Sequence, residues 1–104
     1  PYHDLLVELC RQYRVAQLYL FGSAVTDKFD LKRSDLDFLV QFVQRTPTME
    51  YANQVFGFND ALEALFGRPV DLITVESLKK PGFKSIVEST RELIYDASRQ
   101  STTN

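Results

Sequence analysis

Apolar residues recur every three or four positions at the start of the chain and every second position further on. In residues 2–13 they form one stripe of a helix, made of Tyr2, Leu5, Leu6, Leu9, Cys10 and Tyr13. Residues 15–21 are aliphatic, β-branched and aromatic, which favours a strand that ends at Gly22-Ser23. In residues 35–42 the apolar side chains alternate, so that a second strand places them on one face, namely Leu36, Phe38, Val40 and Phe42.

The second half of the chain carries helix boundaries that are visible in the sequence. Thr46-Pro47 predicts a helix start, with threonine as the N-cap and proline at the first helical position. This helix is expected to run to about Phe66 and to end at Gly67. We then expect a strand over 70–75, a break at Pro81-Gly82, a helix over 83–90 and a short strand over 93–95. The order predicts an α/β (α+β) fold, with a small mixed β-sheet and helices packed on one side.

Length and composition fit one small globular domain. The chain has 104 residues, from which we expect a domain over 1–97 and a disordered tail over 98–104. The net charge of −2 gives no sign of nucleic-acid binding, and no apolar run reaches the ~18 residues that a membrane span needs. A single cysteine, Cys10, forms no internal disulfide and fits a reducing, cytoplasmic compartment. A single histidine, His3, excludes multi-histidine metal sites.

Two carboxylates interrupt the apolar second strand. Asp35 and Asp37 are two residues apart, so a strand points both to the same side, about 7 Å apart along the chain. Two like charges at this spacing repel each other unless a positive group lies between them. Magnesium is the simplest such group, because it prefers carboxylate, water and phosphate oxygens.

A third carboxylate and a glycine turn add to this pattern. Asp71 interrupts the apolar strand that begins at Val70, and it can join the same face if that strand lies beside the second one. Three carboxylates on adjacent strands can hold two Mg²⁺ ions ~3.5–4 Å apart, which is the geometry of in-line attack at phosphorus. Gly22 lets the backbone approach a phosphate closely, and Ser23 can donate a hydrogen bond to it. Alone, a Gly-Ser pair is a weak signal.

Ordinary structural roles for these residues were weighed against this interpretation. Ser34 and Asp37 match a helix capping box, but the run from Phe38 to Phe42 favours a strand. A calcium loop opening at Asp35 would place Leu39 and Val40 where that loop needs an oxygen ligand and a glycine, so we reject it. Solvated edge-strand carboxylates would explain the Asp35–Asp37 pair alone. They explain the joint pattern with Asp71 and Gly22-Ser23 less well.

The combined motif resembles the signature of the DNA polymerase β-like nucleotidyltransferases. Leu20-Phe21-Gly22-Ser23 is followed, after eleven residues beyond Ser23 minus the shared serine, by the run 34–40, and later by Arg68-Pro69-Val70-Asp71. Within that superfamily the chain most resembles the minimal nucleotidyltransferase (MNT) antitoxins. The resemblance implies that Gly22 and Ser23 bind the triphosphate and that Asp35 and Asp37 ligate Mg²⁺. It further implies that Asp71 completes a second metal site and helps to deprotonate the attacking hydroxyl.

The resemblance also implies an activity and a partner. The implied reaction is transfer of AMP from ATP to a hydroxyl, namely a tyrosine of a HEPN ribonuclease toxin that this chain would neutralise as the antitoxin. Two alternatives stay open: an inactive antitoxin that acts by binding alone, and a small-molecule nucleotidyltransferase. Relatives often carry a basic residue soon after Gly-Ser, where this chain has Ala24-Val25-Thr26, and Lys28, Lys32 or Arg33 could take its place.

Overall fold

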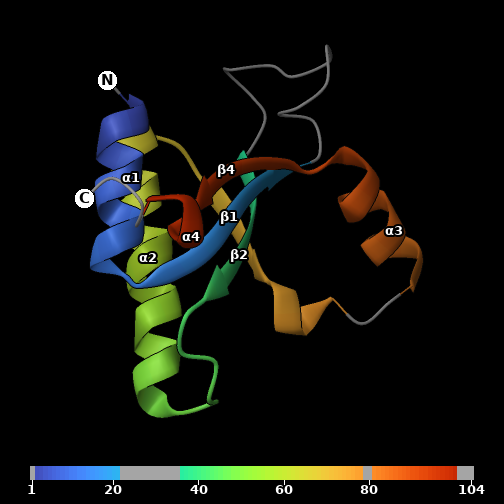
Figure 1. Ribbon diagram of the computed structural model, residues 1–104, viewed down its shortest axis with the longest axis horizontal. Coiled ribbons are helices and arrows are strands. Elements are labelled where there is room, and N and C mark those ends of the chain that lie inside the picture. The colour runs from blue at the N-terminus through green and yellow to red at the C-terminus, as the bar shows by residue number, and fades with distance from the viewer. Residues whose placement is uncertain (1, 22–35, 79–80, 101–104) are drawn as a thin grey trace.

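A four-stranded mixed sheet lies at the centre of the protein (Figure 1). The computed structural model describes residues 2–21, 36–78 and 81–100. The strands are β1 (Val15–Phe21), β2 (Leu36–Phe42), β3 (Val70–Thr74) and β4 (Glu92–Asp96), and they lie in the order β3-β2-β1-β4. β1 is antiparallel to β2 and to β4, whereas β2 and β3 are parallel. The predicted fold class, a small mixed sheet with helices, is confirmed.

Two long helices cover one face of this sheet. α1 (Tyr2–Gln12) and α2 (Met49–Phe66) lie side by side in Figure 1, and α2 is the crossover that joins the parallel strands β2 and β3. The apolar stripe of α1 supplies Leu6 and Cys10, and α2 supplies the fully buried Phe58 and Leu62. These side chains pack against the alternating apolar face of β2 that the sequence predicted, formed by Leu36, Phe38, Val40 and Phe42.

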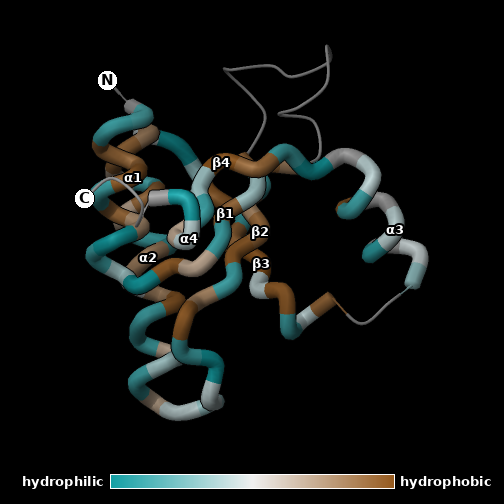
Figure 2. Tube along the Cα trace, viewed as in Figure 1, coloured by the Kyte–Doolittle hydropathy of each residue, from teal (hydrophilic) through white to brown (hydrophobic). Residues whose placement is uncertain are grey.

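The opposite face of the sheet carries a smaller apolar cluster. Phe21 of β1, Leu39 of β2 and Val87 are its buried members. Val87 belongs to α3 (Pro81–Thr90), which stands apart from α1 and α2 in Figure 1. The hydropathy view shows the apolar segments concentrated along the strands that separate the two clusters (Figure 2). The second face is therefore only partly covered, which leaves room for polar side chains on it.

Several element boundaries differ from the predicted ones. α2 begins at Met49 rather than at Pro47, because Thr48 is the N-cap and its hydroxyl accepts a hydrogen bond from the Tyr51 N–H at 3.1 Å. The predicted end is confirmed, since Gly67 closes the helix in the left-handed conformation at φ 67°. α3 begins at Pro81 rather than after Gly82, because a proline needs no N–H partner in the first turn of a helix.

The C-terminal part contains two short helices that were not predicted as such. A 3₁₀ turn, η2 (Val75–Ser77), follows β3. A four-residue helix, α4 (Ala97–Gln100), follows β4, so residues 98–100 are helical where the sequence predicted a disordered tail. The Asp96 carboxylate stabilises its start by accepting hydrogen bonds from the N–H and the hydroxyl of Ser98, at 2.9 and 2.7 Å. No helix among the described segments is both long and apolar enough to cross a bilayer.

Candidate active site

The strand register aligns two of the predicted site carboxylates. Asp37 of β2 pairs with Asp71 of the parallel strand β3, and paired residues of adjacent strands point to the same side of a sheet. Their Cα atoms are therefore about 4.8 Å apart, which is the ordinary distance between neighbouring strands. Asp37 is half-buried and Asp71 is exposed. The condition stated from the sequence, that the third strand lie beside the second, is met.

A row across the sheet extends this pair to β1. Asp37 also pairs with Phe21, the last residue of β1, so the row reads Asp71, Asp37, Phe21. Gly22 and Ser23 follow Phe21 in the sequence but lie outside the described residues, as does Asp35. The structure thus brings together Asp37 and Asp71 of the five predicted site residues. The roles predicted for Gly22, Ser23 and Asp35 remain predictions.

A second row, mostly apolar, lies directly behind the carboxylates. Tyr19 pairs with Leu39, and Leu39 pairs with Ile73, so these side chains share the face that carries Asp37. Leu39 is fully buried, and Tyr19 and Ile73 pack around it. An apolar neighbour row lowers the local dielectric and strengthens electrostatic interactions of the carboxylates. It also fixes the backbone of the strands on which the carboxylates are carried.

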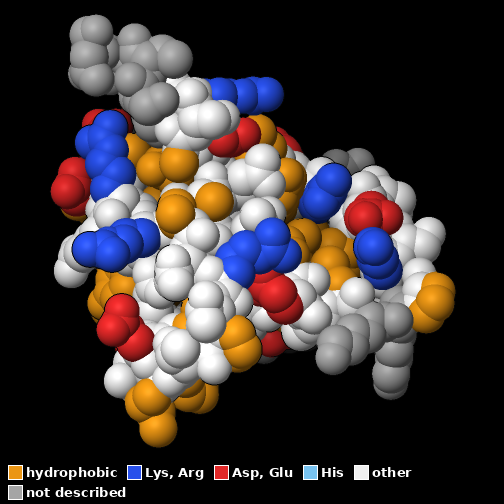
Figure 3. All heavy atoms as spheres, turned by 60° about the horizontal axis from the view of Figure 1, so that its bottom comes forward, with side chains coloured by type: hydrophobic (Ala, Val, Ile, Leu, Met, Phe, Trp, Pro, Cys, Tyr) orange, Lys and Arg blue, Asp and Glu red, His pale blue; other side chains and the backbone are white. Residues whose placement is uncertain are grey.

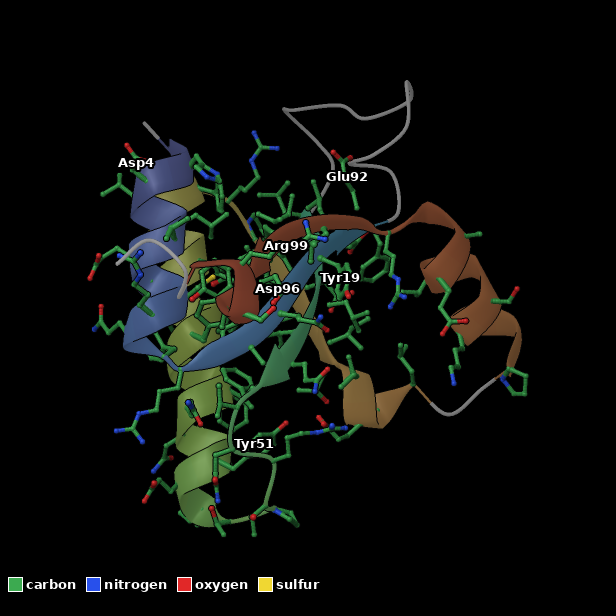
Figure 4. All side chains as sticks on the ribbon, viewed as in Figure 1. Asp4, Tyr19, Tyr51, Glu92, Asp96 and Arg99 are labelled. Carbon is green, nitrogen blue, oxygen red and sulfur yellow. The ribbon has the colours of Figure 1, made fainter. Side chains whose placement is uncertain are left out.

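An arginine from another part of the chain reaches the same face. The guanidinium carbon of Arg91, which follows α3, lies 4.5 Å from the centre of the Tyr19 ring. Tyr19 lies on β1 on the side towards α3 (Figure 4). Its hydroxyl donates to the Gln17 side chain at 3.3 Å, and Gln17 in turn donates to Asp96 at 3.3 Å. Sequence reasoning missed Arg91, because 72 residues separate it from Tyr19 and no local pattern links them.

The space-filling view agrees with a partly open face. Hydrophobic side chains are visible between the main body and α3, with Lys and Arg side chains on either side (Figure 3). A separate apolar cavity of about 360 Å³ lies on the helix-covered face. It is lined by Leu6, Leu20, Leu36, Phe38, Phe66, Arg68 and Ile94. Because only Arg68 brings a polar group to this cavity, we place the candidate chemistry at Asp37 and Asp71 instead.

The fold and the aligned carboxylates define the class of this protein. The family described as the nucleotidyltransferase domain matches residues 4–94, and the chain belongs to this family. The chain is 31% identical over 87 residues to a protein of Methanocaldococcus jannaschii named "Putative protein adenylyltransferase", covering 84% of this chain and 82% of that protein. A second protein of that name from the same organism is 34% identical over 86 residues, covering 81% and 79%.

Solved structures show the same fold. One described as a "putative minimal nucleotidyltransferase" is 26% identical with a TM-score of 0.67, covering 86% of each chain. A toxin–antitoxin structure with AMP-PNP has a TM-score of 0.69 at 18% identity, covering 94% of this chain and 76% of that one. The tri-AMPylated HEPN toxin of Shewanella oneidensis in complex with its MNT antitoxin has a TM-score of 0.63 at 16% identity, covering 96% and 74%.

Proposed function

We propose that this chain transfers AMP from ATP to a tyrosine hydroxyl of a HEPN ribonuclease toxin, and that it acts in this way as the antitoxin. The observation that carries the proposal is the pairing of Asp37 with Asp71 on adjacent strands of a nucleotidyltransferase fold. The relatives named protein adenylyltransferases support AMP as the transferred group and a protein as the acceptor. The structural neighbours that pair an MNT antitoxin with a HEPN toxin support the nature of the partner.

The donor set fits magnesium. Asp37 and Asp71 present carboxylate oxygens from neighbouring strands, and hard oxygen ligands of this kind suit Mg²⁺. Asp37 and Asp71 would hold the metal together with Asp35, which the sequence predicts for the same face. Bound Mg²⁺ supplies neutralisation of the charge that develops on the phosphates. In the described segments no group of three potential ligands lies close enough to hold an ion, so Asp35 or the substrate phosphates would complete the site.

The reaction makes one bond and breaks one bond at the α-phosphorus. The hydroxyl oxygen of the acceptor attacks this phosphorus, and the bond to the oxygen that bridges the α- and β-phosphates breaks. Pyrophosphate leaves with the electron pair of that bond. The exposed carboxylate of Asp71 accepts the hydroxyl proton, while half-buried Asp37 orients the reacting phosphate beside it. Positioning and charge neutralisation supply most of the rate, as in phosphoryl transfer in general.

The product explains how transfer would neutralise a toxin. AMP on a tyrosine adds a negative charge and a bulky base to the surface of the toxin. Near a ribonuclease active site, this charge repels the RNA phosphates and the base occupies their space. The toxin and the antitoxin would meet in the cytoplasm, where the buried thiol of Cys10 stays reduced.

One sequence feature favours a second candidate, an antitoxin that acts by contact alone. Residues 24–26, Ala-Val-Thr, lack the basic residue that relatives often carry after Gly-Ser. An inactive antitoxin would need no such residue. Two adjacent carboxylates weigh against this candidate, because they repel each other and stabilise nothing unless a cation binds.

Intact-mass spectrometry of the toxin distinguishes the two candidates. The wild-type chain with ATP and Mg²⁺ should add one or more AMP groups to the toxin, and Asp37→Asn should add none. The matched control is Asp60→Asn, which makes the same chemical change at an exposed position of α2 and should transfer AMP normally. Full neutralisation of the toxin by Asp37→Asn without any change in mass would establish the contact-only antitoxin.

A further inference from the structure

The position of Arg91 relative to the carboxylate row points to a phosphate-binding role. Glu92 pairs with Leu20 in the antiparallel ladder of β4 and β1. Arg91 precedes Glu92 and therefore adjoins Phe21, which is the β1 member of the row that contains Asp37 and Asp71. The row thus carries two anions on β3 and β2 and, beyond β1, a cation at the start of β4.

The side chain of Arg91 lies on the carboxylate face of the sheet. Its guanidinium carbon is 4.5 Å from the centre of the Tyr19 ring. Tyr19 pairs with Leu39 and packs beside Phe21 and Val87, which places the ring on the face that carries Asp37. Two strand spacings, about 10 Å, separate the Cα positions of Arg91 and Asp37 across β1. A ligand bound over the end of β1 would therefore have the carboxylates on one side and the guanidinium on the other.

The interactions of Arg91 leave its charge available to a ligand. A cation–π contact at an exposed site contributes only about 0.5–1 kcal/mol, so it orients the guanidinium without neutralising it. Within residues 2–21, 36–78 and 81–100, no carboxylate forms an ion pair with Arg91. Arg45, by contrast, is paired with Glu76. The planar guanidinium of an arginine matches two phosphate oxygens at once.

We propose that Arg91 binds the β- and γ-phosphates of the nucleotide and holds pyrophosphate as it leaves. This inference rests on the proposed function, since it assigns one part of the triphosphate to this residue. The α-phosphate has to lie at Asp37 and Asp71, where the hydroxyl attacks, so the rest of the triphosphate can extend over β1 towards Arg91. A polyphosphate approaching two carboxylates needs positive charge besides the metal, and residues 24–26 supply none.

A purely structural role for Arg91 makes a different prediction. Its N–H donates to the carbonyl of Val87 at 2.8 Å, and its positive charge lies just beyond the C-terminus of α3, where it favours the helix dipole. In that case, replacement would lower the melting temperature and weaken all ligands alike. A phosphate-binding role instead predicts that only ligands with a β-phosphate are affected.

Binding of three ligands separates these roles. Isothermal titration of Mg²⁺ with ATP, pyrophosphate or AMP would be compared for the wild type, Arg91→Gln and Arg91→Lys. We expect Arg91→Gln to weaken ATP and pyrophosphate by roughly ten- to a hundredfold, the loss of hydrogen bonds to a charged group. AMP binding should stay unchanged, and Arg91→Lys should recover part of the loss. Arg11→Gln removes an equal charge from α1, on the other face of the sheet, and should bind all three ligands normally.

Each contrary result has a distinct meaning. If Arg91→Gln binds ATP and pyrophosphate as tightly as the wild type does, the inference about Arg91 is wrong and the proposed function stands. Equal losses for ATP, pyrophosphate and AMP, or a lower melting temperature without ligand, also overturn it in favour of the structural role. If the wild-type chain itself binds neither ATP nor pyrophosphate with Mg²⁺, the proposed function fails first.

Discussion

Gly67 is a residue whose identity is required by its backbone conformation. It ends α2 in the left-handed region at φ 67°, and its N–H donates to the carbonyl of Glu63 at 2.8 Å. A Cβ at this position would meet no atom within 4 Å, so the cost of a side chain is conformational only. We expect Gly67→Ala to lower the free energy of unfolding by about 1–2 kcal/mol, as measured by urea denaturation.

Gly82 provides the matched control for Gly67. It lies within α3 without a positive φ, and a Cβ there also meets no atom within 4 Å. Gly82→Ala should therefore raise the free energy of unfolding by roughly 0.5–1 kcal/mol, because alanine is the better helix former. Equal effects of the two substitutions would show that helix propensity, and not the left-handed turn, determines stability at Gly67.

Cys10 is a buried thiol with a strongly altered acidity. Burial raises its pKa from the ordinary value of 9.0 to about 12. Because the folded-state pKa lies above the unfolded one, the stability linked to this thiol is fully present below pH 9 and is lost as the pH rises towards 12. The free energy of unfolding should fall by up to about 1.4 kcal/mol per pH unit in that range from this group.

Two measurements check this prediction for Cys10. The folded protein should resist iodoacetamide at pH 8, and the denatured protein should react at the rate of a free thiol. Burial also raises the pKa values of Tyr51 and Tyr95, so these residues add a loss of stability in the same direction. Cys10→Ala isolates the thiol, because its stability should decline less steeply above pH 9 than that of the wild type. An identical slope would show that Cys10 does not contribute.

At the scale of single elements, the start of α2 tests which threonine acts as the cap. The Thr48 hydroxyl accepts the Tyr51 N–H, whereas the Thr46 hydroxyl accepts only from the Gln44 side chain at 3.3 Å. Thr48→Ala should therefore lower the free energy of unfolding by about 1 kcal/mol, and Thr46→Ala should change it by less than about 0.5 kcal/mol. Thermal melting of both variants decides between the two caps. A larger loss for Thr46→Ala would restore the boundary that the sequence predicted.

The elements show how far local patterns reach. The stripe of α1 and the alternation of β2 were correctly predicted, because each pattern reports directly on which side chains are buried. The end of α2 was found from Gly67, since few other residues adopt that conformation. The start of α2 was misplaced because Thr46-Pro47 and Thr48 are competing signals two residues apart. In β4 and α4 the short runs carry too little pattern to fix their boundaries.

At the scale of the whole molecule, the site depends on strand order, which no local pattern contains. The sequence predicted that Asp71 joins Asp37 only if the two strands are neighbours, and the parallel pairing of β2 with β3 supplies this condition. The contact between Arg91 and Tyr19 also arises only when β4 adds to the far side of β1. The carboxylates could therefore be predicted from their strands, whereas the cation on the same face could not.

The carboxylate pair makes a prediction about the stability of the whole fold. Without metal, Asp37 and Asp71 are like charges on directly paired residues, an arrangement that destabilises a sheet by roughly 0.2–1 kcal/mol. Asp37→Asn removes one of these charges at nearly constant volume. We therefore expect this variant, in EDTA, to unfold with a free energy equal to or slightly above that of the wild type. Asp60→Asn, at an exposed position of α2, should leave stability unchanged and serves as the control.

Ligand addition should reverse the order of the two proteins. With Mg²⁺ and ATP at a hundred times the dissociation constant, the wild type should gain about 2.7 kcal/mol, because ligand binds only the folded state. Asp37→Asn should gain little, since half of the described carboxylate pair no longer ligates the metal. Differential scanning fluorimetry with and without EDTA measures both effects in one series. If Asp37→Asn instead unfolds far below the wild type in EDTA, or gains as much from Mg²⁺ and ATP, then Asp37 supports the fold rather than a nucleotide site.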